Sequence, residues 1–226
     1  QGVPERLEMD YDSLKKINPE LIYASGTGYG PLGPDSAKPS LDGCGQARSG
    51  LMMSATQQSQ TEPSYVAGAV SDQMGGIVLC LGVISALYAR EQSGVGQRVD
   101  VSHLSSTMWL QGLAVSMQLL SGYHYRSTDR KNPLNPLVNA YECADGRWIQ
   151  FMSAQFQRYW PDFATALGIS DLIDDPIVGD IKGMAAGSPE LTKIIADRFK
   201  TKAVDEWIDI FNQYEDLIFA KVQSVE

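Results

Sequence analysis

Residues 71–102, SDQMGGIVLCLGVISALYAREQSGVGQRVDVS, decide the fold class. A long helix is predicted over Asp72–Glu91, and its apolar residues lie almost all round, which is typical of a central, buried helix. Ser93–Gly96 then turns the chain, and Gln97–Ser102 alternates as a short strand does.

The residues before this stretch predict the other half of the same unit. A short helix is expected over Asp10–Asn18, with Ser13 or Asp10 as its cap and Pro19 ending it. A buried strand over Glu20–Ser25 follows, and Gly26–Pro34 is too rich in glycine to be anything but loop. That order is typical of an α/β sheet, in which ligands gather at the carboxyl ends of the strands.

The rest of the chain predicts a second domain. A helix is expected over residues 42–54, and a second long apolar helix from His103 to Leu120. Residues 121–136 are polar and are expected to form an exposed linker, while residues 139–151 carry a hairpin signature around Asp145–Gly146. Further helices are expected near residues 155–167, 189–200 and 203–213. We therefore predict an α/β domain over 1–122, a linker over 123–138 and an α+β domain over 139–226.

Composition narrows the class of protein. The 226 residues are 43% hydrophobic and carry a net charge of −9 without a basic stripe, which argues against partners such as nucleic acid or an anionic membrane. The three cysteines lack metal or disulfide spacing and favour a reducing, cytoplasmic location. The longest apolar run, Ile77–Ile84, is too short to span a bilayer. Because the sequence starts at Gln1 and stops after an apolar segment, we expect an excerpt of a longer chain.

Asp72 is the candidate reactive residue. It is a lone carboxylate in the uncharged stretch Tyr65–Tyr88, at the expected start of the buried helix, with Gly75 and Gly76 directly behind it. A helix start stabilises anions, and glycines let a ligand approach the backbone. Aspartate is also a favoured helix cap, so the pattern leaves a capping role open beside the chemical one.

The other candidates carry weaker signals. Arg6 and Lys38 flank the glycine-rich loop and are either phosphate ligands or solvated surface charges. The loop has neither the lysine of a P-loop nor a dinucleotide fingerprint. His103 and His124 lie outside any ligand spacing, and no GxSxG elbow supports a Ser/His/Asp triad.

Several blocks of sequence, in order, resemble family III (CaiB/BaiF-type) CoA-transferases. Two open the match, LKKINPELIYAS at 14–25 and GYGPLGP at 28–34. The others are PSLD at 39–42, QARSGL at 46–51, SDQMGG at 71–76, ALYAR at 86–90, GVGQRVDVS at 94–102 and YECADGRW at 141–148.

The resemblance implies a Rossmann-like large domain, incomplete here, plus a small α+β domain, in an interlocked homodimer. It implies transfer of coenzyme A from an acyl-CoA to a free carboxylic acid, with Asp72 as the nucleophile of a covalent mechanism. It places Arg6 and Lys38 at the CoA nucleotide, oxyanion donors at Gly75 and Gly76, and substrate-loop residues at Gly28, Tyr29 and Gly30. No metal or tightly bound cofactor is implied.

Departures from the family pattern separate the alternatives. Related α-methylacyl-CoA racemases carry a histidine where this chain has Leu41, so racemisation would lack its second proton-transfer group. Residues 131–141, KNPLNPLVNAY, look more like members acting on 2-hydroxyacyl, aryl-acryloyl or bile-acid CoA esters than like the formyl-CoA subgroup. The family's first strands and part of its CoA site are expected to precede Gln1. A racemase and a non-catalytic CoA-binding protein remain the alternatives.

Overall fold

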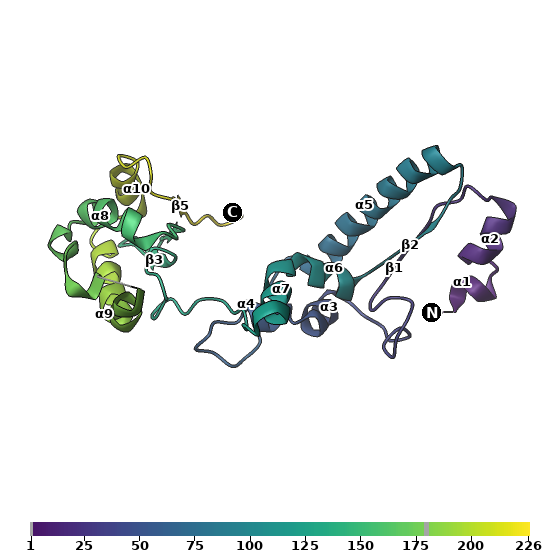
Figure 1. Cartoon of the computed structure of the whole chain (residues 1–226), viewed down its shortest axis with the longest axis horizontal. Coiled ribbons are helices and arrows are strands. Elements are labelled where there is room, and N and C mark those ends of the chain that lie inside the picture. The colour runs from purple at the N-terminus through teal and green to yellow at the C-terminus, as the bar shows by residue number, and fades with distance from the viewer. Residues whose placement is uncertain (1, 179–180) are drawn as a thin grey trace. The chain divides into compact units, whose positions relative to one another are not determined.

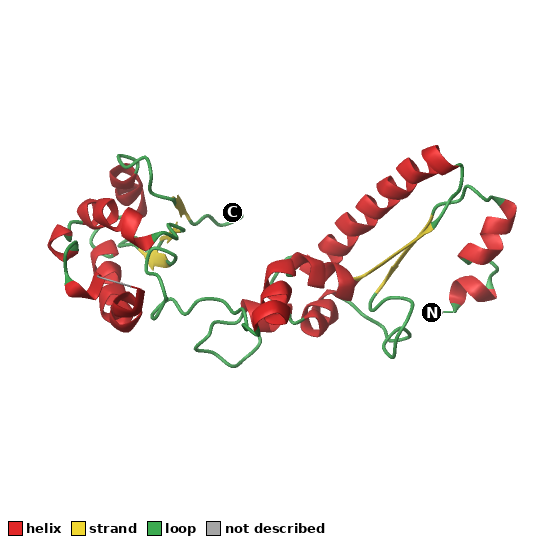
Figure 2. Ribbon diagram, viewed as in Figure 1, coloured by secondary structure: helices red, strands yellow, loops and turns green. Residues whose placement is uncertain are grey.

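The computed structural model describes residues 2–178 and 181–226. The chain divides into two units, residues 1–127 and residues 128–226, which are described separately. Figure 1 labels the elements, and Figure 2 shows that helix predominates in both units while strands form a minor part.

The first unit is built on a parallel pair of strands. β1 (Tyr23–Thr27) pairs with β2 (Arg98–Ser102) in a register that runs from Tyr23 opposite Arg98 to Thr27 opposite Ser102. α5 (Val70–Ser93) lies in the crossover between them and packs on both strands (Figure 1). A crossover helix runs opposite to its strands, so the start of α5 lies at the carboxyl ends of β1 and β2.

Three further pairs of helices complete this unit. α1 (Val3–Arg6) and α2 (Tyr11–Ile17) precede β1, and the predicted cap Asp10 accepts a hydrogen bond from the Ser13 amide at 3.1 Å. α3 (Asp42–Ser49) and α4 (Leu51–Ala55) replace the one helix expected there, because Gly50 ends the first in a left-handed conformation. α6 (His103–Leu110) and α7 (Gly112–Ser121) likewise replace one long helix, with the break at Gln111.

The first strand lies further along the sequence than predicted. β1 begins at Tyr23 rather than Glu20, and it includes Gly26 and Thr27, which were expected in the loop. Residues 18–21 form a turn instead, closed by the Leu21 amide donating to the Asn18 carbonyl and by the Gly96 amide donating to Pro19. Those contacts take the backbone groups that an earlier strand start would need.

The expectation that α5 is buried was wrong for this chain. Ile77, Leu81 and Ile84 are 63%, 57% and 58% exposed, and only Ser71 and Ala86 of the helix are buried. The expectation assumed that other elements pack against every side of α5. In the described residues, α5 packs mainly against one small sheet and the helices α3 and α6. Among the described helices α5 alone is long and apolar enough to cross a membrane, properties that core helices of soluble proteins share.

The second unit packs helices against a three-stranded antiparallel sheet. The predicted hairpin is present as β3 (Ala140–Glu142) and β4 (Trp148–Phe151), and β5 (Phe219–Lys221) adds to the other edge of β4. α8 (Phe156–Leu167), α9 (Ile181–Phe199) and α10 (Val204–Phe211) enclose its core, with short 3-10 helices at Ser170–Leu172 and Pro176–Val178. Phe151, Phe163 and Phe211 centre the core, and Phe151 meets Phe163 edge-on at 5.0 Å between ring centroids.

Candidate active site

A cavity of about 360 Å³ opens at the carboxyl ends of the two parallel strands. Its walls come from the ends of β1 and β2, from the first turns of α5 and from the loop before α3. The lining residues are Gly26, Thr27, Gly28, Ser40, Asp72, Gly75, Gly76, Leu79, Val101, Ser102 and His103. The sequence predicted this edge of the sheet as the ligand site, and the structure places Asp72 there.

Asp72 is the third residue of α5, and its side chain is 51% exposed. The helix begins two residues before the predicted start, and its cap position is Ala69 in a left-handed conformation. Asp72 therefore does not cap the helix, and that interpretation of its role was wrong. A carboxylate in the first turn is still stabilised by the positive end of the helix dipole.

Asp42, which lies on α3, caps the start of α5. Its Oδ1 accepts from the Ser71 amide at 2.6 Å and from the Asp72 amide at 3.4 Å. Its Oδ2 accepts from the Tyr65 hydroxyl at 2.8 Å and from the Gln46 amide at 2.7 Å. Burial alone would raise the pKa of Asp42, but these donors outweigh it and hold the pKa below its ordinary value.

His103 is the neighbour that sequence reasoning missed. Its Nε2 lies 3.1 Å from Asp72 Oδ1, and its Nδ1 lies 3.3 Å from the Ser40 hydroxyl. It is the first residue of α6, directly after β2, and Ser102 caps that helix by accepting from the Ser105 amide at 3.0 Å. The available signal was position, since a polar residue that directly follows a strand lies at the edge where parallel strands present ligands.

Two glycines allow α3 and the loop before it to approach this cluster. A Cβ on Gly45 would lie 2.8 Å from His103 Cβ and 2.9 Å from Ser71 Cβ, and a Cβ on Gly28 would lie 2.3 Å from Ser40 Cβ. Real Cβ atoms do not come so close, so both positions exclude a side chain. Gly28 was predicted as a loop residue of the substrate site, and in the structure it lines the cavity and admits Ser40.

Gly45→Ala is expected to destabilise the protein by about 1–3 kcal/mol, because α3 must move away from α5 and α6. Urea unfolding of the variant measures the loss. Gly43→Ala is the matched control on the same helix, since a Cβ there meets only the Tyr65 ring at 3.7 Å. Equal unfolding midpoints for the two variants would contradict the close packing described here.

Gly75 and Gly76 line the cavity but do not present free amides. Their oxyanion role was predicted from a helix start at Asp72, whereas the helix starts at Val70. They therefore lie in its second turn, where amides donate to carbonyls four residues earlier. A Cβ on Gly76 would meet no atom within 4 Å, so the helix surface at this point is open to a ligand.

The remaining predicted residues lie outside the cavity lining. Lys38 is exposed and pairs with Asp35 at 2.6 Å, and Arg48 shares that carboxylate at 3.1 Å. Arg6 is exposed in the last turn of α1. Gly30 donates its amide to the Thr27 hydroxyl at 3.0 Å, which folds the loop containing Tyr29 back onto the end of β1.

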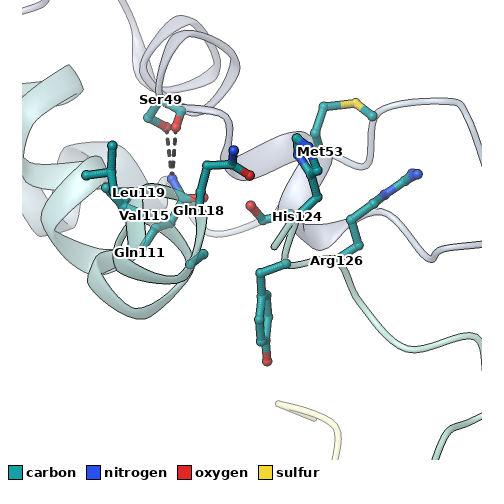
Figure 3. A pocket seen from close by; sticks show the side chains of 11 residues that line it. Ser49, Met53, Gln111, Val115, Gln118, Leu119, His124 and Arg126 are labelled. Atoms are coloured by element: carbon teal, nitrogen blue, oxygen red, sulfur yellow. Dashed lines mark hydrogen bonds between the residues drawn. The ribbon is translucent and has the colours of Figure 1, made fainter. Parts of the chain in front are cut away.

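A second cavity, of about 510 Å³, lies between α4, α7 and residues 124–126 (Figure 3). Gln111 donates to the Ser49 carbonyl at 3.2 Å on one wall, and His124 and Arg126 lie on the other. Its lining carries no carboxylate, so the first cavity is the candidate reactive site. Within residues 2–178 and 181–226, no group of three His, Cys, Asp or Glu side chains has the geometry to hold a metal ion.

Comparison with known proteins gives one consistent family. The family model described as "CoA-transferase family III" matches residues 1–226. The chain is 29% identical to the (R)-2-hydroxy-4-methylpentanoate CoA-transferase of Clostridioides difficile, covering 98% of this chain and 55% of that protein. It is 31% identical to the cinnamoyl-CoA:phenyllactate CoA-transferase of Clostridium sporogenes, covering 96% and 53%. The human alpha-methylacyl-CoA racemase is 29% identical, covering 94% and 54%.

A solved structure shares this fold. A CaiB/BaiF family protein from Brucella suis superposes with a TM-score of 0.84 at 24% identity, covering 99% of this chain and 58% of that one. The chain spans about half the length of the curated relatives it matches. The mixed α/β fold expected from the sequence is therefore confirmed.

Proposed function

Because the chain belongs to CoA-transferase family III, we propose that the protein transfers coenzyme A from an acyl-CoA donor to a free carboxylic acid, with Asp72 as nucleophile. The observation that carries the proposal is the placement of Asp72. It is a half-exposed carboxylate that faces a cavity at the carboxyl ends of parallel strands. Its capping role is filled by Asp42, so the helix does not need it.

The proposed reaction passes through two covalent intermediates. Asp72 attacks the thioester carbonyl, forming a mixed anhydride and releasing the CoA thiolate. The thiolate attacks the carbonyl carbon of Asp72, which forms an enzyme–CoA thioester and releases the donor acid as its carboxylate. The acceptor carboxylate then attacks that thioester, and the same steps in reverse order return Asp72 and give the new acyl-CoA.

The geometry disfavours racemisation at this site. A racemase needs an acid and a base on opposite faces of the substrate α-carbon. Asp72 and His103 are in direct contact at 3.1 Å, which leaves no room for a carbon between them. Leu41, at the position of the racemase histidine, is 79% exposed and carries no proton to transfer.

Arg6 and Lys38 are proposed as ligands of the CoA phosphates, with Gly28, Tyr29 and Gly30 as the loop beside the acyl group. The Lys38 side chain is exposed, and Arg48 would still pair with Asp35 if Lys38 turned to a phosphate. Exchanging Asp35 for a phosphate therefore leaves neither partner without an opposite charge. CoA and its acyl esters would be bound as substrates rather than as a resident cofactor.

The substrate class we propose is a 2-hydroxyacyl or aryl-acryloyl CoA ester. The sequence of residues 131–141 favours this substrate class. One relative is named for a 2-hydroxy acid, and another is named for cinnamoyl-CoA. We further propose a cytoplasmic, interlocked homodimer. The exposed apolar side chains of α7, with Leu113 at 68% and Leu119 at 79%, suit burial against further protein.

Trapping the intermediate tests the function. The whole protein, as the cell makes it, is mixed with a panel of acyl-CoAs and quenched with borohydride, and peptides are analysed by mass spectrometry. We expect reduction of a thioester at Asp72, absent in Asp72→Ala. Exchange of the α-proton without an adduct would instead favour a racemase, and neither signal would favour a binding protein.

A further inference from the structure

We propose that His103 is a catalytic residue, which donates a hydrogen bond to the enzyme-side carbonyl oxygen of the anhydride and so directs the CoA thiolate to Asp72. The inference rests on the proposed function. The anhydride contains two carbonyl groups, and attack at the acyl side only regenerates the donor. Forward reaction therefore needs a feature that favours the enzyme-side carbon.

The contact between His103 and Asp72 supplies that feature. Nε2 lies 3.1 Å from Oδ1, so Oδ1 faces the imidazole while Oδ2 is the oxygen left to attack the donor. Once Oδ2 is acylated, Oδ1 becomes the carbonyl oxygen of the enzyme-side group. Nε2 therefore already lies beside the atom on which negative charge develops.

Asp72 itself requires the proton to lie on Nε2. An ionised carboxylate only accepts hydrogen bonds, so the nitrogen 3.1 Å from Oδ1 is the one that carries the proton in a neutral imidazole. Nδ1 is then unprotonated and faces the Ser40 hydroxyl at 3.3 Å, which positions the ring. Gly28 and Gly45 admit Ser40 and α3 to this position, so the orientation of the ring is built into the packing.

The backbone of α5 has no comparable donor at Oδ1. The Ser71 and Asp72 amides are directed at Asp42, at 2.6 and 3.4 Å. The Gly75 and Gly76 amides lie in the second turn and are engaged within the helix. Among the described groups on the helix side of the cavity, the imidazole of His103 is the one whose N–H can donate to Oδ1.

The proposed step forms one bond at the Asp72 carbonyl carbon and breaks another. The thiolate sulfur bonds to the Asp72 carbonyl carbon, and the negative charge moves onto Oδ1, where the Nε2 proton stabilises it. Collapse of this intermediate breaks the bond from that carbon to Oδ2. The donor acid leaves as a carboxylate that carries Oδ2, and Asp72 remains as the CoA thioester.

The test measures which intermediate accumulates. The whole protein is mixed with donor acyl-CoA alone and quenched in acid after milliseconds to seconds. The mass of the intact protein is then measured by mass spectrometry, because acyl and CoA adducts differ in mass. In His103→Leu we expect enzyme–CoA formation to slow roughly 10²-fold, the usual effect of losing one oxyanion donor, with the acyl adduct in its place. His103→Gln, which retains an N–H donor, should recover part of the rate.

Two further variants keep the test decisive. Ser40→Ala leaves residue 103 intact and should slow the same step several-fold, in case His103→Leu folds poorly. His124→Leu removes the other histidine and should match the wild type. Unchanged thioester formation in His103→Leu, or equal slowing of both adducts, would overturn the role. Absence of any adduct in the wild type would instead reject the proposed function.

Discussion

Asp72→Asn is expected to lower the rate of CoA transfer by at least about 10⁴-fold, as removal of a covalent nucleophile does. The amide has nearly the shape of the carboxylate, and its oxygen can face His103 Nε2 as Oδ1 does. Folding should therefore change by less than about 0.5 kcal/mol, which separates chemistry from stability. The loss of activity is measured as the steady-state rate of CoA transfer, with the acyl-CoA that trapping identifies as the donor. Unfolding followed by circular dichroism measures the stability of the fold.

Two variants sharpen this result. Asp72→Glu keeps the carboxylate but displaces it by one methylene, and a misplacement of about 1 Å costs on the order of 10²-fold. Its activity should lie between the asparagine variant and the wild type. Asp12→Asn changes an exposed carboxylate on α2 and should leave the rate unaltered. Slow recovery of activity in Asp72→Asn is to be checked by mass for deamidation, and full initial activity would refute the nucleophile.

The sequence was sufficient for what depends on local pattern. The apolar run after Asp72 predicted α5 and the alternation before His103 predicted β2, because periodicity and glycine turns act over a few residues. The same patterns placed Asp72 at the edge where a crossover helix begins and parallel strands end. The hairpin around Asp145–Gly146 was predicted for the same reason, with Gly146 in the left-handed conformation that such a turn requires.

What the sequence could not show depends on contacts between distant residues. Asp42 and Ser71 are 29 positions apart, and Ser40 and His103 are 63 apart, so no spacing rule joins them. The capping interpretation of Asp72 failed because the cap comes from another helix. The exposure of α5 was missed because periodicity reports which faces are apolar, and not which neighbours cover them.

Asp42→Ala is expected to destabilise the protein by about 2–4 kcal/mol, because it removes a buried acceptor that serves several donors. The Ser71 amide and the Gln46 side chain are themselves buried, so each loses a partner that water cannot easily replace. Asp42→Asn should cost less, since its carbonyl oxygen still accepts from Ser71. Asp100→Asn, which breaks an exposed pair with Arg98, is the control and should cost about 0–1 kcal/mol.

The pH dependence of this loss identifies its origin. The folded-state pKa of Asp42 lies below the unfolded value of about 3.9, so the carboxylate stabilises the fold above that pH. Its contribution disappears as pH falls from about 4 through the lower folded-state pKa. The difference in unfolding free energy between wild type and Asp42→Asn should therefore shrink in acid, and a constant difference would show that ionisation is irrelevant. Because the same carboxylate fixes the first turn of α5, CoA transfer by Asp42→Asn at about pH 7 should fall on the order of 10-fold or more through displacement of Asp72.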